Sequence, residues 1–201
     1  MKKLYAGEMF AGYGGLALAI KAAFHEYGYD VETKWLAEFD EGPSKVLDER
    51  FNGIPNLGDV TAVDWGNPEF KVDLLGGSSP CQDISSAGTQ LGMTEGTRSN
   101  LWVAQRDAIR LIRPTWVVWE NVRGACSAKA HSEMEYCSGC LGERERGTEL
   151  RALGRVLGDL SELGYDARWK NLYASEVGAP HRRDRIFLVA KKASDPDSRL
   201  R

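Results

Sequence analysis

The chain has 201 residues, 42% of them hydrophobic and 27% charged, which is the composition of a globular protein long enough to build one core. No stretch approaches about 18 apolar residues, which argues against a membrane-spanning helix, and Met1 leads directly into a strand-like pattern, which argues against a signal peptide. Residues 1–100 carry 8 basic and 15 acidic side chains and residues 101–201 carry 18 and 14, so a polyanionic partner would meet the second half, unless the charges are simply scattered over the surface.

The first elements have the pattern that opens a nucleotide-binding α/β unit. Residues 4–10 are short, apolar and β-favouring, residues 10–15 form a glycine-rich turn, and a helical period of apolar residues then runs to Tyr27. Glycines allow a sharp turn and a close approach of a ligand to the backbone. A tight turn with a purely structural role explains the Gly-x-Gly pattern nearly as well as a ligand-binding turn does.

The second predicted strand, residues 31–37, ends at acidic residues. An acid at this position, here Glu38 or Asp40, binds ribose hydroxyls in nucleotide-binding folds, and Phe39 could cover an adenine ring. Asp40 could instead cap the helix predicted over residues 44–51.

Two further strands lead to the same edge of the predicted sheet. A third strand would end before Asp59, and the buried strand at residues 72–75 ends at a Gly pair, shortly before Cys81. About eighteen residues without a helical or strand period follow Cys81, and such a long loop is usually functional or disordered. Cys81 is therefore either a nucleophile under a covering loop or a structural cysteine beside a surface loop.

A helix over residues 100–113, stopped by Pro114, precedes a buried strand at residues 115–119 that ends at Glu120. An acid there lies at the carboxyl edge of the sheet, where open α/β sheets bind ligands. If Glu120 is buried, its protonated form is favoured and it could donate a proton. The alternative is a carboxylate that bonds to the following turn.

An insertion at residues 125–148 interrupts this pattern. It contains residue types that bind zinc, spaced C-x4-H-x5-C-x2-C: Cys126, His131, Cys137 and Cys140. They form a possible structural zinc site, or a polar surface insertion with free thiols.

The last elements are an amphipathic helix at residues 150–163 and two strands, at residues 166–173 and 186–190. The cationic cluster at residues 181–185 lies just before the final strand and is suited to an anion. Residues 192–201 have no apolar period and are predicted to form a flexible tail.

Four of these segments, in this order, resemble the motifs of DNA (cytosine-5) methyltransferases that use S-adenosylmethionine. The turn at residues 10–15 resembles the cofactor loop, residues 76–82 the nucleophile motif, and Glu120-Asn121-Val122 the third hallmark of the family. Residues 180–185 resemble the late Gln-x-Arg-x-Arg motif, with His181 in place of Gln. Four motifs in the right order are very specific, and they favour the nucleophile interpretation of Cys81.

The resemblance implies a Rossmann-like methyltransferase fold of the α/β class, with a mainly parallel seven-stranded sheet, helices on both faces and an antiparallel last strand. A catalytic domain would span residues 1–191. Neither the family's target-recognition region nor its Asn-rich cofactor motif is found after Ala190. A separate subunit could supply them, or the chain could be a minimal form or an inactive relative.

The resemblance also assigns roles to residues. The catalytic residues would be Cys81, Glu120, Arg183 and Arg185. The S-adenosylmethionine-binding residues would be Phe10, Gly12, Gly14, Glu38, Phe39, Asp59, Pro80 and Leu101. The residues contacting DNA or the target base would be Gln82, Ser85 and Arg98.

The implied substrate is a cytosine flipped out of double-stranded DNA, in the cytoplasm of a bacterium or of a phage-infected host, where methylation would protect DNA against restriction. Two other classes of function stay open. One is a non-catalytic DNA-binding or regulatory module with the same fold. The other is a dinucleotide-dependent enzyme with a catalytic cysteine, which would leave the Glu120 and Arg183-x-Arg185 motifs unexplained.

Overall fold

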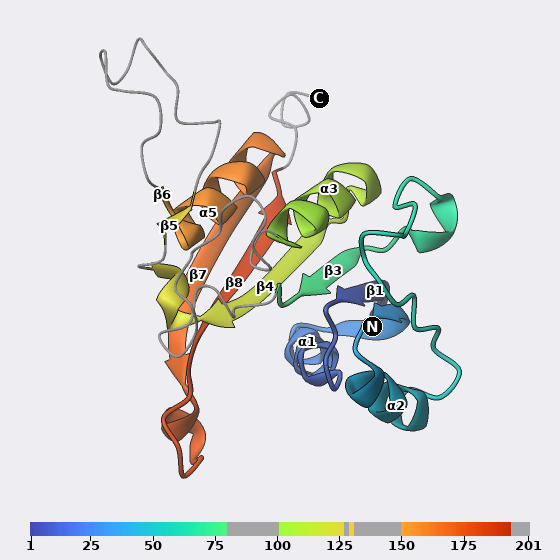
Figure 1. The fold of residues 1–201 in the computed structure, drawn as a ribbon, viewed down its shortest axis with the longest axis horizontal. Helices are drawn as coiled ribbons and strands as arrows, with labels where there is room; N and C mark the ends of the chain where they lie inside the picture. Colours follow the sequence, from blue (N-terminus) through green and yellow to red (C-terminus); the bar gives the residue numbers. More distant parts are fainter. Residues whose placement is uncertain (80–100, 127–128, 131–149, 194–201) are drawn as a thin grey trace.

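A computed structural model of the chain describes residues 1–79, 101–126, 129–130 and 150–193 (Figure 1). Its first half contains β1 (Lys2–Met9), α1 (Gly15–Glu26), β2 (Tyr29–Ala37), α2 (Glu41–Arg50), the short helix η1 (Pro68–Phe70) and β3 (Leu74–Gly77). Its second half contains α3 (Trp102–Ile112), β4 (Trp116–Val122), η3 (Arg123–Cys126), β5 (Lys129–Ala130), β6 (Leu150–Arg151), α5 (Ala152–Glu162), β7 (Tyr165–Tyr173), η5 (Ala174–Val177) and β8 (Asp184–Lys192).

Within the described residues, the main sheet has six strands in the order β2-β1-β3-β4-β8-β7, and β5 pairs with β6 in a separate ribbon. The strands β2, β1, β3 and β4 are parallel, whereas β8 is antiparallel to both of its neighbours. The predicted α/β class and the antiparallel last strand are therefore confirmed.

The third strand expected before Asp59 is not formed. Only an isolated parallel bridge joins Leu36 to Asn56, so the described sheet has one strand fewer than predicted. Pro55 cannot donate a ladder hydrogen bond, and Gly53 and Gly58 on either side both have positive φ angles. These residues confine the pairing with β2 to a single point.

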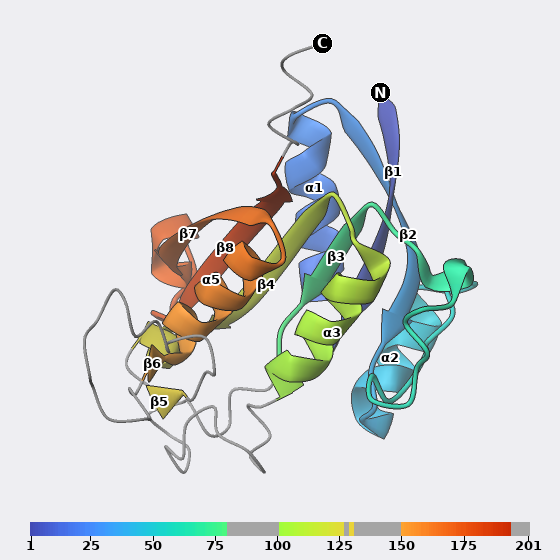
Figure 2. The same ribbon diagram turned by 90° about the horizontal axis from the view of Figure 1, so that it is seen from above.

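Helices cover the two faces of the sheet (Figure 1 and Figure 2). Figure 1 shows α3 and α5 on one face and α1 and α2 on the other. Alternating residues of β4 serve the two faces, since Val117 and Trp119 belong to the core cluster beneath α3 and α5, and Val118 belongs to the cluster beneath α1. The rings of Trp102 and Trp119 meet edge to face at 6.2 Å, which joins α3 to the sheet.

Register brings the ends of the parallel strands to one edge. Met9 lies between Ala37 and Gly77, and Gly77 is opposite Trp119. The antiparallel β8 begins at this edge, where Arg185 is opposite Val122. None of the helices in the described part of the chain is both long enough and apolar enough to cross a membrane.

Candidate functional site

The turn between β1 and α1 has an unusual backbone. Phe10, Gly12 and Gly14 have φ angles of 56°, 54° and 76°, all in the left-handed region. This conformation costs glycine little, but it is unfavourable for Phe10. A non-glycine residue held in this way points to a loop whose shape is fixed by its surroundings.

The two glycines of this turn serve different purposes. A Cβ added at Gly14 would lie 2.2 Å from the ring of Phe51, whereas one added at Gly12 would meet nothing within 4 Å. Gly14 therefore lets α1 pack against the end of α2. Gly12 leaves open space at the surface of the loop, as a ligand-binding backbone requires.

Glu38 is bonded to this loop. Its Oε2 accepts a hydrogen bond from the backbone N–H of Gly12 at 2.7 Å, and its Oε1 accepts one from the N–H of Asp40 at 2.8 Å. Asn56 accepts from the N–H of Glu38 at 2.9 Å and donates to the Glu38 carbonyl and to the Ser44 hydroxyl. The carboxylate is thus fixed at the end of β2, where the sequence predicted a ribose-binding acid.

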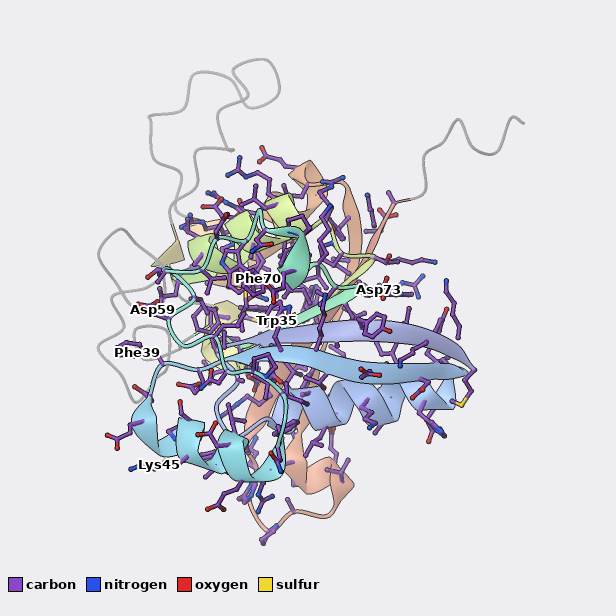
Figure 3. All side chains as sticks on the ribbon, turned by 90° about the vertical axis from the view of Figure 1, so that its right-hand side faces the viewer. Trp35, Phe39, Lys45, Asp59, Phe70 and Asp73 are labelled. Carbon is purple, nitrogen blue, oxygen red and sulfur yellow. The ribbon has the colours of Figure 1, made fainter. Side chains whose placement is uncertain are left out.

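Phe39 and Asp59 project from neighbouring loops at the same edge (Figure 3). Phe39 is 75% exposed. Hydrogen bonds from the backbone N–H and then the hydroxyl of Thr61 lower the pKa of Asp59 and keep it ionised. An exposed aromatic face beside an ionised acceptor fits an adenine, whose ring can stack and whose amino group can donate. Asp40 occupies the N-cap position of α2 but makes no side-chain capping bond.

Sequence analysis missed one buried acid, Glu8. Glu8 lies near the end of β1, is 2% exposed, and its Oε2 has no hydrogen-bond partner. Burial first, and then the negative charges of Glu38 and Glu120, raise its pKa to about 8, although the backbone N–H of Ala17 in the first turn of α1 opposes the shift. The sequence signal that could have identified Glu8 is its position as a lone acid within an apolar strand, directly before a glycine-rich turn.

The end of β3 is held by buried polar groups. Trp119 Nε1 donates to the Ser79 hydroxyl at 3.3 Å, and Asn121 Nδ2 donates to the Ser79 carbonyl at 3.1 Å. Gly77 is in contact with Gln105, because a Cβ at this glycine would lie 2.5 Å from the amide nitrogen of that residue. These contacts fix the backbone at the start of the predicted nucleophile motif, before Cys81.

Residues 80–82 of that motif and the loop that follows it lie outside the described residues, so the predictions for these positions are untested by the structure. The predicted residues concerned are Pro80, Cys81, Gln82, Ser85 and Arg98. Leu101, predicted to contact the cofactor, is half-buried at the N-cap of α3.

Glu120 and Arg185 form an ion pair across β4 and β8. Arg185 Nε lies 3.0 Å from Glu120 Oε1, and the two side chains are 24% and 20% exposed. Glu120 is opposite Phe187 and Arg185 is opposite Val122, so the two side chains are diagonal neighbours on one face. The structure brings these two predicted catalytic residues together. The sequence left open whether Glu120 is buried. In the structure its side chain is only partly buried.

Arg183 does not join this pair. It is exposed and has a φ angle of 31°. Its neighbour Arg182 lies over the ring of Tyr173, 4.7 Å from the centroid. Arg123 donates to the Tyr173 hydroxyl at 3.2 Å and pairs with Asp184 at 3.4 Å. The predicted cationic cluster therefore divides into one arginine at the site and others outside it.

The predicted zinc site is not supported within the described residues. These contain no group of three or more histidine, cysteine or acidic side chains that could bind a metal. Cys126 lies at the end of η3, where partial burial raises the pKa of its thiol and favours the neutral form. The other proposed ligands, His131, Cys137 and Cys140, fall outside the described residues.

Comparison with known sequences gives a consistent result. The family model for C-5 cytosine-specific DNA methylases matches residues 4–199. The type II methyltransferase M.NgoBV of Neisseria gonorrhoeae is 28% identical over 98% of this chain, which corresponds to 43% of that protein. M.PspPI of Psychrobacter sp. (strain TA137) is 34% identical over 90% of this chain and 38% of its own length. This chain therefore spans less than half of the length of these relatives.

Solved structures share the fold. The Dnmt2 methyltransferase of S. pombe has a TM-score of 0.67 at 15% identity and matches 96% of this chain and 50% of its own. A putative DNA modification methyltransferase encoded within an E. coli prophage has a TM-score of 0.62 at 21% identity and matches 94% of this chain and 47% of its own. At these identities the likeness concerns the fold alone.

Proposed function

This chain belongs to the C-5 cytosine-specific DNA methylase family, and we propose that it catalyses transfer of a methyl group from S-adenosylmethionine to carbon 5 of a cytosine in DNA. The observation that carries the proposal is the ion pair of Glu120 and Arg185 at the carboxyl edge of the sheet. An acid and a cation placed together can respectively protonate a ring nitrogen and stabilise negative charge on the adjacent carbonyl.

The residues present fit the cofactor. Glu38 is fixed where it can accept hydrogen bonds from ribose hydroxyls, and Phe39 and Asp59 suit the adenine. Gly12 leaves the loop open, and Glu8 adds negative potential beneath it whenever its carboxyl is ionised. S-adenosylmethionine, when bound, would supply a methyl group on a sulfonium, and a cationic group is favoured near these acids.

The chemistry needs a nucleophile, and we assign that role to Cys81. Its thiolate would add to carbon 6 of the cytosine, which makes carbon 5 nucleophilic and drives electron density toward ring nitrogen 3. Glu120 would protonate that nitrogen, and Arg185 would hold Glu120 and the neighbouring carbonyl in place. After methylation, loss of the proton from carbon 5 to a base expels Cys81 as a thiolate. Carbon 6 is inaccessible within a duplex, so the cytosine must be flipped out.

Target recognition and part of the cofactor pocket would depend on polypeptide beyond these residues. The relatives are more than twice as long as the region that this chain matches. We propose that a region or separate subunit equivalent to their remaining length supplies sequence specificity. Relatives from bacteria and from a Bacillus phage support a role in modifying bacterial or phage DNA in the cytoplasm.

The test is methyl transfer from labelled S-adenosylmethionine to a mixed-sequence duplex, with Cys81→Ala as the control variant and calorimetry to measure cofactor binding. Label recovered as 5-methylcytosine, and absent with Cys81→Ala, is the expected result. Cofactor binding without transfer would indicate a partner-dependent or non-catalytic DNA-binding module. Protection by NAD rather than by S-adenosylmethionine would overturn the proposal.

A further inference from the structure

The outer side of β2 leaves one edge of the main sheet open. Within the described residues, β2 pairs along its length with β1, and on its outer side it makes only the bridge from Leu36 to Asn56. Leu36 exchanges backbone hydrogen bonds of 3.0 and 2.8 Å with residues 55–57 at this point, so the strand forms ladder bonds where a partner reaches it. Over residues 29–34, which we call the open edge, no strand in the described part of the chain lies beside β2.

A cavity of about 610 Å³ adjoins the open edge. Its walls are Ala17, Leu18 and Lys21 of α1, residues 32–34 of β2, and residues 50–54 at the end of α2 and in the loop after it. Figure 3 shows α1 and α2 below β2. Val31 packs in one core cluster with Ile20 of α1, so the cavity lies on the face of β2 that α1 covers. Since side chains of a strand alternate between faces, a strand added to the open edge would point every second side chain toward the cavity.

The cavity carries unpaired positive charge. Lys21 and Arg50 are exposed, and among the described residues neither side chain has a hydrogen-bond or ion-pair partner. Lys34 is already bonded, because its ammonium donates to a backbone carbonyl at 3.3 Å. The acid among the lining residues, Glu32, is paired with Lys3. Residues 1–100 carry 8 basic and 15 acidic side chains, so two unpaired cations beside the open edge are a local reversal of charge.

We propose that the open edge binds an extended acidic segment of a partner protein, which adds to the sheet as a further strand and directs acidic side chains toward Lys21 and Arg50. In contacts of this kind, backbone hydrogen bonds supply affinity and pockets for alternate side chains supply specificity. Leu18, which is 56% exposed, offers apolar surface to the stems of those side chains. A nucleic acid would pair with the two cations but would leave the backbone groups of β2 without partners.

The lysine and arginine of this surface are not among the residues assigned to the cofactor or to the cytosine, so the inference is independent of the proposed function. The test measures binding of labelled peptides, about eight residues long, by fluorescence anisotropy. The acidic probe alternates Glu with Thr and should bind, whereas a probe with Lys in place of Glu should not. Two further acidic probes carry N-methyl groups on the odd or on the even backbone nitrogens. One of these two should bind at least about tenfold more weakly, because only one set of N–H groups faces β2.

Variants of the protein test the charge. Lys21→Gln and Arg50→Gln should each weaken binding of the acidic probe about 2- to 5-fold, because each removes one exposed ion pair. Both side chains are exposed, so thermal unfolding and affinity for S-adenosylmethionine should match the wild type. The matched controls are Lys170→Gln and Arg168→Gln, at exposed positions of β7, which is the strand at the other edge of the sheet. These controls should leave binding of the probe unchanged.

Three results would overturn the proposal. The first is that the acidic probe does not bind, or that both N-methylated probes bind as well as it does. The second is that the β7 variants weaken binding and the Lys21 and Arg50 variants do not, which would place the contact at the other edge. The third is a dimer of this chain, detected by sedimentation and dissociated by Lys21→Gln, which would make a second copy the occupant instead of an acidic partner.

Discussion

The sheet consists of two regions that present opposite charge at the same edge. The parallel region, β2-β1-β3, ends in Glu38 and the loop carrying Asp59. The antiparallel region, β8-β7, ends in Arg185 and in the exposed basic residues His181, Arg182 and Arg183. The acidic region suits a small cationic cofactor, and the basic region suits a polyanion. Two ligands of opposite charge can therefore be bound close to each other on one sheet.

The two regions meet at β4, which is parallel to β3 and antiparallel to β8. Burial is the main cause of the raised pKa of Glu8, and the charge of Glu120 on β4 adds to it, while Glu120 also pairs with Arg185. The acid assigned to catalysis thus lies at the boundary between the proposed cofactor side and the proposed DNA side.

The largest expected effect comes from removing the charge at this boundary. Glu120→Gln should lower kcat for methyl transfer about 10²- to 10³-fold, because the amide cannot protonate a ring nitrogen. DNA affinity should change little, since the exposed arginines at positions 182 and 183 remain. Single-turnover kinetics on a labelled duplex measures the first quantity and anisotropy the second. Glu162→Gln, at the end of α5, is the matched control. A kcat within a factor of three of the wild type would remove Glu120 from the mechanism.

Glu8→Gln should stabilise the protein at neutral pH. The folded pKa of about 8 lies above the ordinary value of 4.5, so between these values the unfolded chain loses a proton that the folded protein keeps. Stability contributed by this group is therefore lost as pH rises through this window, at a cost on the order of 3 kcal/mol near pH 7. Glutamine keeps an acceptor for the Ala17 N–H and removes the pH dependence.

Urea unfolding of both proteins at about pH 5 and about pH 8.5 measures the effect. The stability advantage of the variant should grow with pH. A constant difference across this range would show that Glu8 titrates as an ordinary exposed acid, and burial would then not raise its pKa.

The parallel region was largely predictable because each of its elements is encoded locally. The strand, glycine turn and helix over residues 4–27, and the acid at Glu38, follow from short patterns of apolar residues and glycines. The prediction of a third strand before Asp59 was wrong, because the apolar pattern does not show that Pro55 and its flanking glycines limit pairing with β2. Glu8 was missed because acidic side chains are seldom fully buried, although alternation places it on the same face of β1 as Leu4 and Ala6.

The antiparallel region was predicted less completely. The resemblance nominated both Glu120 and Arg185, but their pairing depends on the register of β4 against β8, which short-range patterns do not encode. The turn between β7 and β8 is held by backbone hydrogen bonds from Ala174 and by the Glu176 carboxylate, and composition does not reveal these bonds. The role of Cys81 still rests on its motif and on family membership.

The two glycines of the cofactor loop offer a matched pair. Gly14→Ala should cost about 2–4 kcal/mol, because the added Cβ would overlap Phe51 and the residue has a left-handed φ. Gly12→Ala meets open space, so it should cost about 1 kcal/mol from backbone strain alone. Thermal unfolding measures both. Relative to its small effect on stability, Gly12→Ala should weaken cofactor binding more than Gly14→Ala does. Equal losses of stability in the two variants would contradict the assignment of separate roles to the two glycines.

The smallest expected effect is at Asn56, which positions Glu38 and is not among the residues predicted to bind the cofactor. Asn56→Ala removes the bonds to the backbone N–H and carbonyl of Glu38, and water can replace part of them because the site is half-exposed. We expect a loss of about 1 kcal/mol in stability and a roughly five-fold weaker affinity for S-adenosylmethionine by calorimetry. Ser44→Ala, which removes one bond to the same carbonyl and the bond from Asn56 to the Ser44 hydroxyl, should do less, because Asn56 still bonds to Glu38 directly. If both variants bind the cofactor like the wild type, then Gly12 and Asp40 alone hold Glu38, and the acidic region depends on the turn itself rather than on the polar network behind it.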